Sequence, residues 1–245
     1  PDGHAVLNGD DALVSAMAGL TAAPVLRYGS GQDCDLRAAD LVSHGLQGIS
    51  FTIHYRGAKL PAVSPMPGRH SSYACLAATA VGLLEGMSWP EIEAGLARGA
   101  QFARIVARPG RNGSTIIDDT YNASPASTVA ALELLGELSG RRIAILGDMF
   151  ELGSYEEQGH REVGRQAAAK VDRLIVVGER ARWIGEEALA AGLRDVTFAA
   201  SKGEVAPELQ PGDQVLVKGS RGMAMEEVVA RLRLPEGEAE EVTEE

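Results

Sequence analysis

The chain has 245 residues, of which 45% are hydrophobic and 29 are glycine, and its formal charge is −11 at pH 7. This length suits one large or two ordinary domains, and the composition is typical of an α/β protein. Neutralising nucleic-acid phosphates requires clustered Lys and Arg, so an acidic chain without a basic stripe argues against nucleic acid as the main partner. Without a signal peptide or an apolar run of about 18 residues, we expect a cytoplasmic protein and no membrane insertion.

The two ends of the chain and its cysteines add further expectations about disorder, disulfides and metal binding. The last ten residues, 236–245, hold six Glu and no base, so residues 1–235 carry only −5. We expect this acidic tail to be disordered and solvated. Cys34 and Cys75 lie far apart without a CxxC pattern, which indicates neither a disulfide framework nor a zinc site. Because the chain begins at Pro1 and not at Met, we expect it to be part of a longer protein.

Residues 1–108 combine strands with two helices. Strands are expected within HAVLNGDD (4–11), PVLRYG (24–29), GISFTIHYRG (48–57) and AKLPAV (58–63). One long helix is predicted over residues 70–86, and a second over 89–98 with Pro90 near its first turn. These strands suffice for a sheet, but the segment does not show the elements that would complete a separate domain around it. This is typical of the rear part of a larger domain.

From residue 113 onward, short apolar runs alternate with amphipathic segments. Strands are predicted at 114–117, 142–147, 173–178, 196–200 and 214–219, and helices at 125–138, 156–170, 180–191, 203–209 and 224–233. Continuous apolar strands separated by such helices predict a mostly parallel sheet covered on both faces, as in a Rossmann-like domain. We expect a hinge near residues 104–112, where Pro and Gly cluster.

The ends of these strands carry polar residues. The strands lead into Asp118-Asp119, Gly147-Asp148, Gly178-Glu179 and Gly219-Ser220. Because α/β proteins bind ligands at the carboxyl edge of the sheet, the sequence predicts a site there. The alternative for Asp118 and Asp119 is that they are turn and cap residues.

Five segments resemble, in order and spacing, motifs of the Mur ligase family: LNGDD (7–11), GRH (68–70), DDTYNASP (118–125), GDMFELG (147–153) and KGSRGM (218–223). Within the family the similarity is to the type that joins D-alanyl-D-alanine to UDP-N-acetylmuramoyl-tripeptide. The resemblance implies an α/β fold in which residues 1–108 form the rear part of a central ATPase-type domain. Residues 109–235 would then form the Rossmann-like C-terminal domain.

The resemblance also implies an activity, namely ATP-dependent amide synthesis through an acyl phosphate in peptidoglycan precursor synthesis, with ATP and Mg²⁺ as cofactors. Such a reaction requires a phosphate-cradling loop, Mg²⁺ and exclusion of water. YGSGQD (28–33) and RPGRNG (108–113) are rich in Gly, but nothing in the chain matches G-x-x-x-x-G-K-S/T. In the family that loop and the metal ligands lie upstream. We therefore expect no catalytic or metal-binding residue here, and an inactive chain without the missing N-terminal part of the same protein.

Carried over from the family, the expected nucleotide-binding residues are His70, Ser71, Arg104, Asp119 and Tyr121. Asp119 would bind the ribose hydroxyls and Arg104 the phosphates, where a fixed cation is favoured. The alternatives are a solvated interdomain arginine for Arg104 and an ordinary packing residue for Tyr121. The sequence departs from the family pattern G-x-H-N-x-x-N, because Ser71 and Ala74 replace its asparagines, which weakens the case for adenine recognition. His70 is equally compatible with packing at a helix start.

The expected substrate-binding residues are Asn122, Ser124, Asp148, Met149, Lys218, Ser220 and Arg221. Asn122 would lie beside the phosphate and the incoming dipeptide, or it is a turn former. Asp148, with Met149 and Phe150 after it, suits a pocket wall. Lys218 and Arg221, ahead of the last helix, would hold the carboxylate of the dipeptide.

Several polar residues have simpler interpretations. Asp10 and Asp11 could bind a metal ion, but adjacent acids after a strand more often form a turn and a helix cap. Glu151 suits a cap, and His160 a surface or packing role, because neither sequence context supplies a catalytic partner. Two alternatives remain for the whole chain, namely a folded but inactive nucleotide- or dipeptide-binding fragment, and a different Mur or folylpolyglutamate-type ligase.

Overall fold

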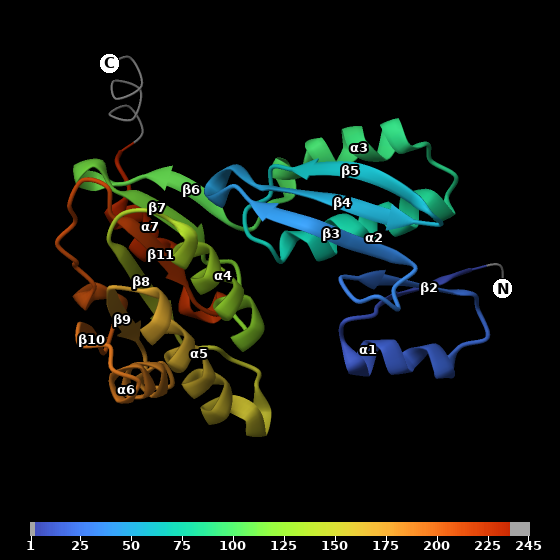
Figure 1. Cartoon of the computed structure of the whole chain (residues 1–245). Helices are drawn as coiled ribbons and strands as arrows, with labels where there is room; N and C mark the ends of the chain where they lie inside the picture. The colour runs from blue at the N-terminus through green and yellow to red at the C-terminus, as the bar shows by residue number, and fades with distance from the viewer. Residues whose placement is uncertain (1–2, 236–245) are drawn as a thin grey trace, which may run out of the picture. The chain divides into compact units, whose positions relative to one another are not determined.

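The structure, a computed structural model, describes residues 3–235 and divides between Ala103 and Arg104 into an N-terminal and a C-terminal unit. Each unit is built on its own sheet (Figure 1). The acidic tail expected at 236–245 lies outside the described residues. The expected domain boundary at residue 108 stays a prediction. Strand β6 (Val106–Pro109), which contains this residue, pairs with the next strand of the C-terminal unit.

The N-terminal unit contains a five-stranded sheet of order β1-β2-β3-β4-β5. Its strands are β1 (Ala5–Asn8), β2 (Val25–Gly29), β3 (Leu36–Ser43), β4 (Ile49–Tyr55) and β5 (Ala58–Ser64). Its helices are α1 (Ala12–Ala16), α2 (Ser71–Leu84) and α3 (Trp89–Ala97), with 3-10 turns at Met17–Leu20, Gly45–Gln47 and Gly99–Phe102. The first three strands are parallel, and β4 and β5 are antiparallel to their preceding neighbours.

One face of this sheet is covered by α2 and α3 (Figure 1). Successive side chains of a strand point to opposite faces, and β5 shows the result, because Ala62 is 2% exposed and Val63 is 60% exposed. Ile49, Phe51 and Ile53 of β4 are buried in the core under the helices. Among the described residues, the opposite face therefore leaves apolar side chains in solvent.

The C-terminal unit contains a six-stranded sheet of order β10-β9-β8-β11-β7-β6. Its strands are β6 (Val106–Pro109), β7 (Thr115–Asp119), β8 (Arg142–Gly147), β9 (Arg173–Val177), β10 (Val196–Ala199) and β11 (Gln214–Lys218). Its helices are α4 (Pro125–Glu137), α5 (Glu156–Lys170), α6 (Arg182–Ala190) and α7 (Glu226–Leu232). Further 3-10 turns are at Arg111–Gly113, Gly153–Tyr155, Lys202–Glu204 and Arg221–Met223. Only β6 runs antiparallel to its neighbour, so the predicted Rossmann-like, mostly parallel sheet is confirmed.

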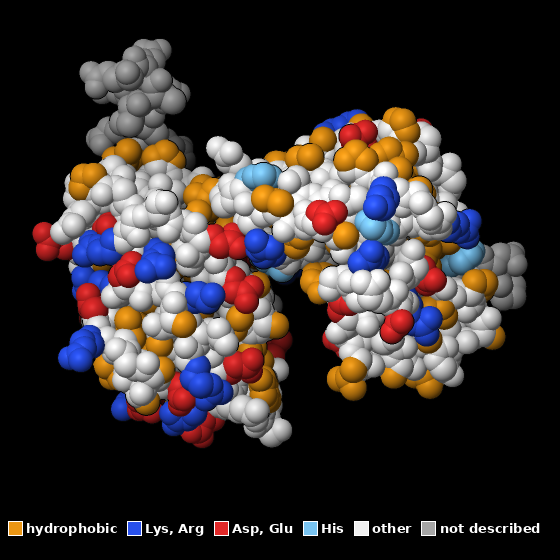
Figure 2. Space-filling view, viewed as in Figure 1, with side chains coloured by type: hydrophobic (Ala, Val, Ile, Leu, Met, Phe, Trp, Pro, Cys, Tyr) orange, Lys and Arg blue, Asp and Glu red, His pale blue; other side chains and the backbone are white. Residues whose placement is uncertain are grey.

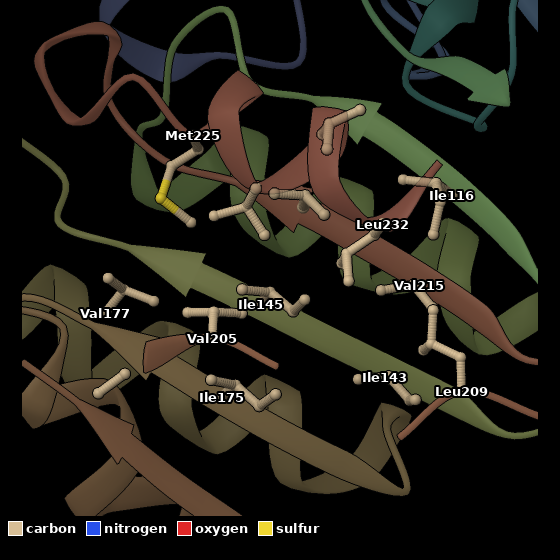
Figure 3. Packing of buried hydrophobic residues seen from close by; sticks show 14 residues of the cluster. Ile116, Ile143, Ile145, Ile175, Val177, Val205, Leu209, Val215, Met225 and Leu232 are labelled. Carbon is tan, nitrogen blue, oxygen red and sulfur yellow. The ribbon is translucent and has the colours of Figure 1, made fainter. Parts of the chain in front are cut away.

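Apolar side chains cover both faces of the second sheet. On one face Ile145 and Val215 pack with Leu232 of α7 and with the loop before β11 (Figure 3). On the other face lie α4, α5 and α6 (Figure 1), whose inward residues, among them Leu132 and Ile184, are fully buried. The strands thus read as continuous apolar runs because neither face meets solvent.

The exposed surface of this unit carries charges of both signs, which are interspersed on the face shown in Figure 2. On α5, Arg161 pairs with Glu157 at 2.8 Å and Arg165 pairs with Glu187 of α6 at 2.9 Å. Exposed pairs of this kind each contribute about 0–1 kcal/mol. None of the helices described between residues 3 and 235 is long and apolar enough to cross a membrane.

One expectation about secondary structure is wrong, and three elements, namely β3, β6 and α1, were not expected. In place of a helix at 203–209 there is only the 3-10 turn Lys202–Glu204. Pro207 explains the difference, because proline lacks a backbone donor and disfavours helical backbone at the residue before it. Strand β3 is absent from the expected set because its alternation is interrupted at Asp40, which has a φ of 53° and lies within a register shift.

The contact between α5 and α6 supplies a stability test. A Cβ added at Gly164 of α5 would lie 2.4 Å from the Ile184 carbonyl oxygen of α6. Helix propensity alone predicts that Gly164→Ala stabilises by ~1 kcal/mol, whereas overpacking costs ~1–3 kcal/mol. Because the close atom belongs to the backbone, we expect a net loss, measured as a lower midpoint of thermal unfolding.

Gly95 of α3 is the matched control, because a Cβ there meets nothing within 4 Å. Gly95→Ala should raise the stability of the N-terminal unit by ~0.5–1 kcal/mol. Equal stabilisation by both substitutions would contradict the close packing of α5 against α6.

Candidate functional site

The ends of β7 and β11 are joined by a buried ion pair. Lys218 and Asp119 are direct partners in the parallel register. The Lys218 ammonium donates to Asp119 Oδ2 at 2.6 Å and to the Asn122 carbonyl at 2.9 Å. Lys218 is 2% exposed and Asp119 5% exposed. Lys218, expected to hold a substrate carboxylate, is therefore directed into the protein.

The electrostatics of this pair are set by its burial. Loss of hydration lowers the pKa of Lys218 below its ordinary value, while the nearby Asp119 carboxylate opposes that shift. The Asn122 carbonyl is a further acceptor for the ammonium. The pair consequently fixes the direction in which the chain leaves β7.

The adjacent acids Asp118 and Asp119 have different partners. Asp118 Oδ2 accepts from Arg108 of β6 at 3.2 Å, and its Oδ1 accepts from the Thr120 hydroxyl at 2.8 Å. Neighbouring residues of a strand point to opposite sides, which separates the two carboxylates. The turn interpretation therefore holds for Asp118, while Asp119 belongs to the ion pair.

A pocket of about 440 Å³ lies at this edge of the sheet. Three loops line it, namely those that follow β7, β8 and β11. The lining residues are Tyr121, Asn122, Ala123 and Ser124, then Phe150, Glu151 and Leu152, then Ser220, Arg221 and Gly222. Five of the residues expected from the sequence are thus brought together here.

Ser220 joins the three loops. Its amide donates to the Asp148 carbonyl at 3.0 Å, and its hydroxyl accepts from the Phe150 amide at 2.8 Å. The same hydroxyl donates to the Ala123 carbonyl at 3.4 Å. Ser220 is 3% exposed, so its side chain organises the pocket from beneath.

The β7 loop ends in the cap of α4. Ser124 Oγ accepts from the Ser127 amide at 3.3 Å, and Ser127 Oγ accepts from the Ser124 amide at 3.0 Å. This reciprocal capping box, with Pro125 at the first helical position, fixes the start of the helix. Ser124 therefore borders the pocket while its hydroxyl caps the helix.

Asp148 and Met149, expected in the pocket wall, lie beneath it. Asp148 Oδ1 accepts from the Ala181 amide at 2.7 Å, which connects β8 to the start of α6. Met149 is 1% exposed, and its amide donates to His160 Nε2 at 3.0 Å. The wall itself is made by Phe150 and the residues after it.

Glu151, Leu152 and Gly222 line the pocket although the sequence did not single them out as binding residues. Their only signal is that they lie within the GDMFELG and KGSRGM segments. The cap expected of Glu151 is wrong, because α5 begins with Tyr155 at its cap position. Glu151 instead has a φ of 64°, in the left-handed region, and its side chain is exposed.

Arg104 is placed by an aromatic ring. Its guanidinium lies 5.1 Å from the ring centroid of Tyr121, a distance typical of a cation–π contact. Both side chains are exposed, with Tyr121 61% exposed. The planar guanidinium can therefore still donate to an anion from its edges.

The two remaining nucleotide-binding candidates belong to the N-terminal unit, at the start of α2. The Ser71 hydroxyl donates to the Pro67 carbonyl at 2.7 Å and is buried. His70 is exposed, and its ring lies over Gly68, where a Cβ would be 2.6 Å from the His70 Cε1 atom. The Ser71 donor is thus already engaged within the protein.

The glycine-rich turn after β2 holds an internal carboxylate. Asp10 accepts from the amides of Ser30 and Gly31 at 2.6 and 2.9 Å and from the Tyr73 hydroxyl at 2.9 Å. Asp11 caps α1 by accepting from its first amides. The turn-and-cap interpretation of these acids is confirmed. Within residues 3–235, no group of three or more His, Cys, Asp or Glu side chains could hold a metal ion.

Comparison with known proteins places these features in context. Residues 103–221 match a family model described as Mur ligase, glutamate ligase domain. The chain is 35% identical over 202 residues to the UDP-N-acetylmuramoyl-tripeptide--D-alanyl-D-alanine ligase of Escherichia coli strain K12, covering 79% of this chain and 43% of that protein. It is 34% identical over 251 residues to the ligase of the same name from Mycobacterium tuberculosis strain CDC 1551, covering 91% of this chain and 49% of the relative.

A crystal structure of MurF from Acinetobacter baumannii superimposes with a TM-score of 0.82 at 27% identity, covering 95% of this chain and 52% of that one. The chain thus spans about half the length of the relatives that it matches.

The buried ion pair generates a prediction about stability. Lys218→Met removes the cation of the buried pair with Asp119, and breaking such a pair by removal of one partner costs ~3–5 kcal/mol of unfolding free energy. Adding Asp119→Asn to that variant removes the buried charge as well and should recover most of the loss. Urea denaturation of the three proteins measures both effects.

Lys202 is the matched control, because its ammonium pairs with the exposed Glu227 at 2.8 Å. Lys202→Met should cost less than ~1 kcal/mol. If Lys218→Met cost no more than this control, the ion pair would not organise the sheet edge.

Proposed function

The chain belongs to the Mur ligase family, and we propose that the protein of which it forms part is an ATP-dependent ligase. In this proposal the ligase joins D-alanyl-D-alanine to UDP-N-acetylmuramoyl-tripeptide in the cytoplasm, as a step of peptidoglycan precursor synthesis. The names of relatives at 34–35% identity support this reaction. The observation that carries the proposal is the pocket at the carboxyl edge of the C-terminal sheet.

The pocket suits a small polar ligand. A volume of about 440 Å³ lies in the range of ordinary small-molecule sites, roughly 300–1,000 Å³. Arg221 lines the pocket with 66% of its side chain exposed, held at 3.3 Å from Glu226. We assign the carboxylate of the dipeptide to Arg221, whose guanidinium can bind it with two parallel hydrogen bonds. Lys218 is excluded from this role by its burial.

The nucleotide contacts divide into those that fit and those that do not. Arg104, exposed over Tyr121, fits a phosphate ligand. Asp119 fits a ribose contact poorly, because its Oδ2 accepts from Lys218 and the residue is 5% exposed. When bound, ATP with Mg²⁺ supplies the phosphoryl group that activates the substrate carboxylate. This chain's residues would then orient the dipeptide and exclude water.

Part of the machinery is absent from these 245 residues, because they contain no G-x-x-x-x-G-K-S/T segment. The Asp10 carboxylate also takes the amides of the Ser30–Gly31 turn that could otherwise bind a phosphate. We propose that the phosphate loop and the Mg²⁺ ligands are contributed by a preceding part of the same protein. The isolated chain would then be a folded unit without ligase activity.

A second candidate is a ligase that adds glutamate, because the matching family model is described as a glutamate ligase domain. The two candidates differ in the amine substrate. Phosphate release from ATP would be measured for the full reading frame and for this chain, with UDP-N-acetylmuramoyl-tripeptide and either D-alanyl-D-alanine or glutamate. Release by the longer protein that requires the dipeptide supports the proposal. Release that requires glutamate, or no release with either amine, overturns it.

Substitution of Arg221 tests the assigned contact. Loss of a charged hydrogen bond costs about 1.5–3 kcal/mol, so Arg221→Ala in the full-length enzyme should raise the KM for the dipeptide roughly 10- to 100-fold. The KM for ATP should stay unchanged. Arg221→Lys should fall between the two, because an ammonium cannot form the bidentate contact.

Arg182→Ala is the control, since Arg182 lies on the surface of α6 and pairs with Glu186 at 3.7 Å. It should leave both KM values unchanged. A dipeptide KM that responds equally to Arg182→Ala and Arg221→Ala would contradict the assignment.

A further inference from the structure

His160 is a fully buried titratable group that the proposed reaction does not use. Its Nε2 accepts from the Met149 amide at 3.0 Å, and its Nδ1 lies 2.7 Å from the Glu156 carbonyl oxygen. An amide can only donate, so Nε2 carries no proton and Nδ1–H donates to Glu156. These partners therefore assign a neutral imidazole with its proton on Nδ1.

The Met149 amide lies in the segment that leads from β8 into the pocket wall. On one side of this segment, Ser220 accepts from the Phe150 amide and donates to the Asp148 carbonyl. On the other side, His160 accepts from Met149. The segment is thus held between the β11 loop and α5.

The wall that follows needs such support. Glu151 has a φ of 64°, and a residue other than glycine in the left-handed region costs of order 1–3 kcal/mol. Such backbone persists only where the surrounding contacts determine it. The bond from Met149 lies two residues before Glu151 and supplies one of these contacts.

We propose that His160 is a positioning residue, which fixes the pocket wall of Phe150, Glu151 and Leu152 through the Met149 amide and thereby sets the affinity for the dipeptide. The consequence for the dipeptide rests on the proposed function. The bond between the imidazole and the Met149 amide does not.

Protonation of His160 opposes this arrangement, because a proton on Nε2 would face the Met149 amide donor. Burial lowers the pKa of His160, and the charge of Arg180 lowers it further. The bond to the Glu156 carbonyl and the carboxylates of Asp148 and Glu156 raise the pKa, but the net shift is downward. Trp183 of α6 adds a ring edge at 5.8 Å. Because the pKa of His160 in the folded protein lies below the ordinary value of about 6.5, the neutral imidazole stabilises the folded state fully above that pH. This stabilisation is lost as the pH falls below about 6.5 and through the folded pKa.

Two substitutions in the full-length protein separate positioning from packing. Glutamine at position 160 can still accept from Met149 without titrating, whereas phenylalanine fills the space without an acceptor. His160→Phe should raise the dipeptide KM about tenfold at pH 8 and leave the ATP KM unchanged. His160→Gln should retain the low dipeptide KM and abolish its rise at acidic pH. His44→Gln, which removes an exposed histidine of the N-terminal unit, should keep the wild-type pH profile.

Hydrogen exchange of the Met149 amide, followed by NMR in the same proteins, tests the bond independently of any substrate. Protection in the wild type and in His160→Gln, with at least a tenfold faster exchange in His160→Phe, supports the proposal. Equal protection of the Met149 amide in all three proteins overturns the proposal. If the exchange results hold but the enzyme does not accept D-alanyl-D-alanine, the proposed function fails and the positioning of the wall by His160 stands.

Discussion

The buried ion pair between Lys218 and Asp119 is the contact on which the carboxyl edge of the C-terminal sheet depends. Lys218 of β11 and Asp119 of β7 lie directly opposite each other in adjacent parallel strands, and their side chains form the pair. The Lys218 ammonium also donates to the Asn122 carbonyl in the loop after β7. A buried ion pair is weak evidence for stability, because desolvation offsets much of its attraction. Its structural effect is directional, because the same ammonium ties the loop after β7 to the end of β11 through the Asn122 carbonyl. Loss of either partner would break this connection between the two strands.

Hydrogen bonds close to this ion pair position the loops that line the pocket. Ser220, two residues after Lys218, connects the β7, β8 and β11 loops through backbone and side-chain hydrogen bonds. His160 holds the β8 loop from the side of α5. The cations then divide by location, because Lys218 is buried within the scaffold while Arg104 and Arg221 are exposed. Only exposed cations can exchange a water ligand for a substrate carboxylate or phosphate at low cost.

Much of the fold could be predicted because its signals are local. Apolar runs and helical periodicity located strands β7 to β11 and helices α4 to α7 of the C-terminal unit, and the mostly parallel orientation of the strands followed from their alternation. The prediction of a helix at 203–209 was wrong because it followed the alternation of strands and helices and gave too little weight to Pro207. Strand β3 was missed because Asp40 interrupts its alternation.

The site was less predictable because its contacts are long-range. Lys218 and Asp119 are separated by 99 positions in the chain, so nothing near Lys218 in the sequence indicates that its charge is buried. His160 lacked an evident partner because its partners are backbone groups, which every residue carries. Resemblance to a family indicated the segments that line the pocket, but the structure was needed to separate Arg221, which lines the pocket, from Lys218, which is buried.

A crystal structure of the full-length protein with D-alanyl-D-alanine would test the proposed pocket and the role of Arg221 together. We expect the dipeptide between the three loops of the pocket, with its carboxylate within hydrogen-bond distance of the Arg221 guanidinium and with the Lys218–Asp119 pair intact. A dipeptide bound outside this pocket, or a carboxylate that displaces Asp119 from Lys218, would show that the assignment is wrong.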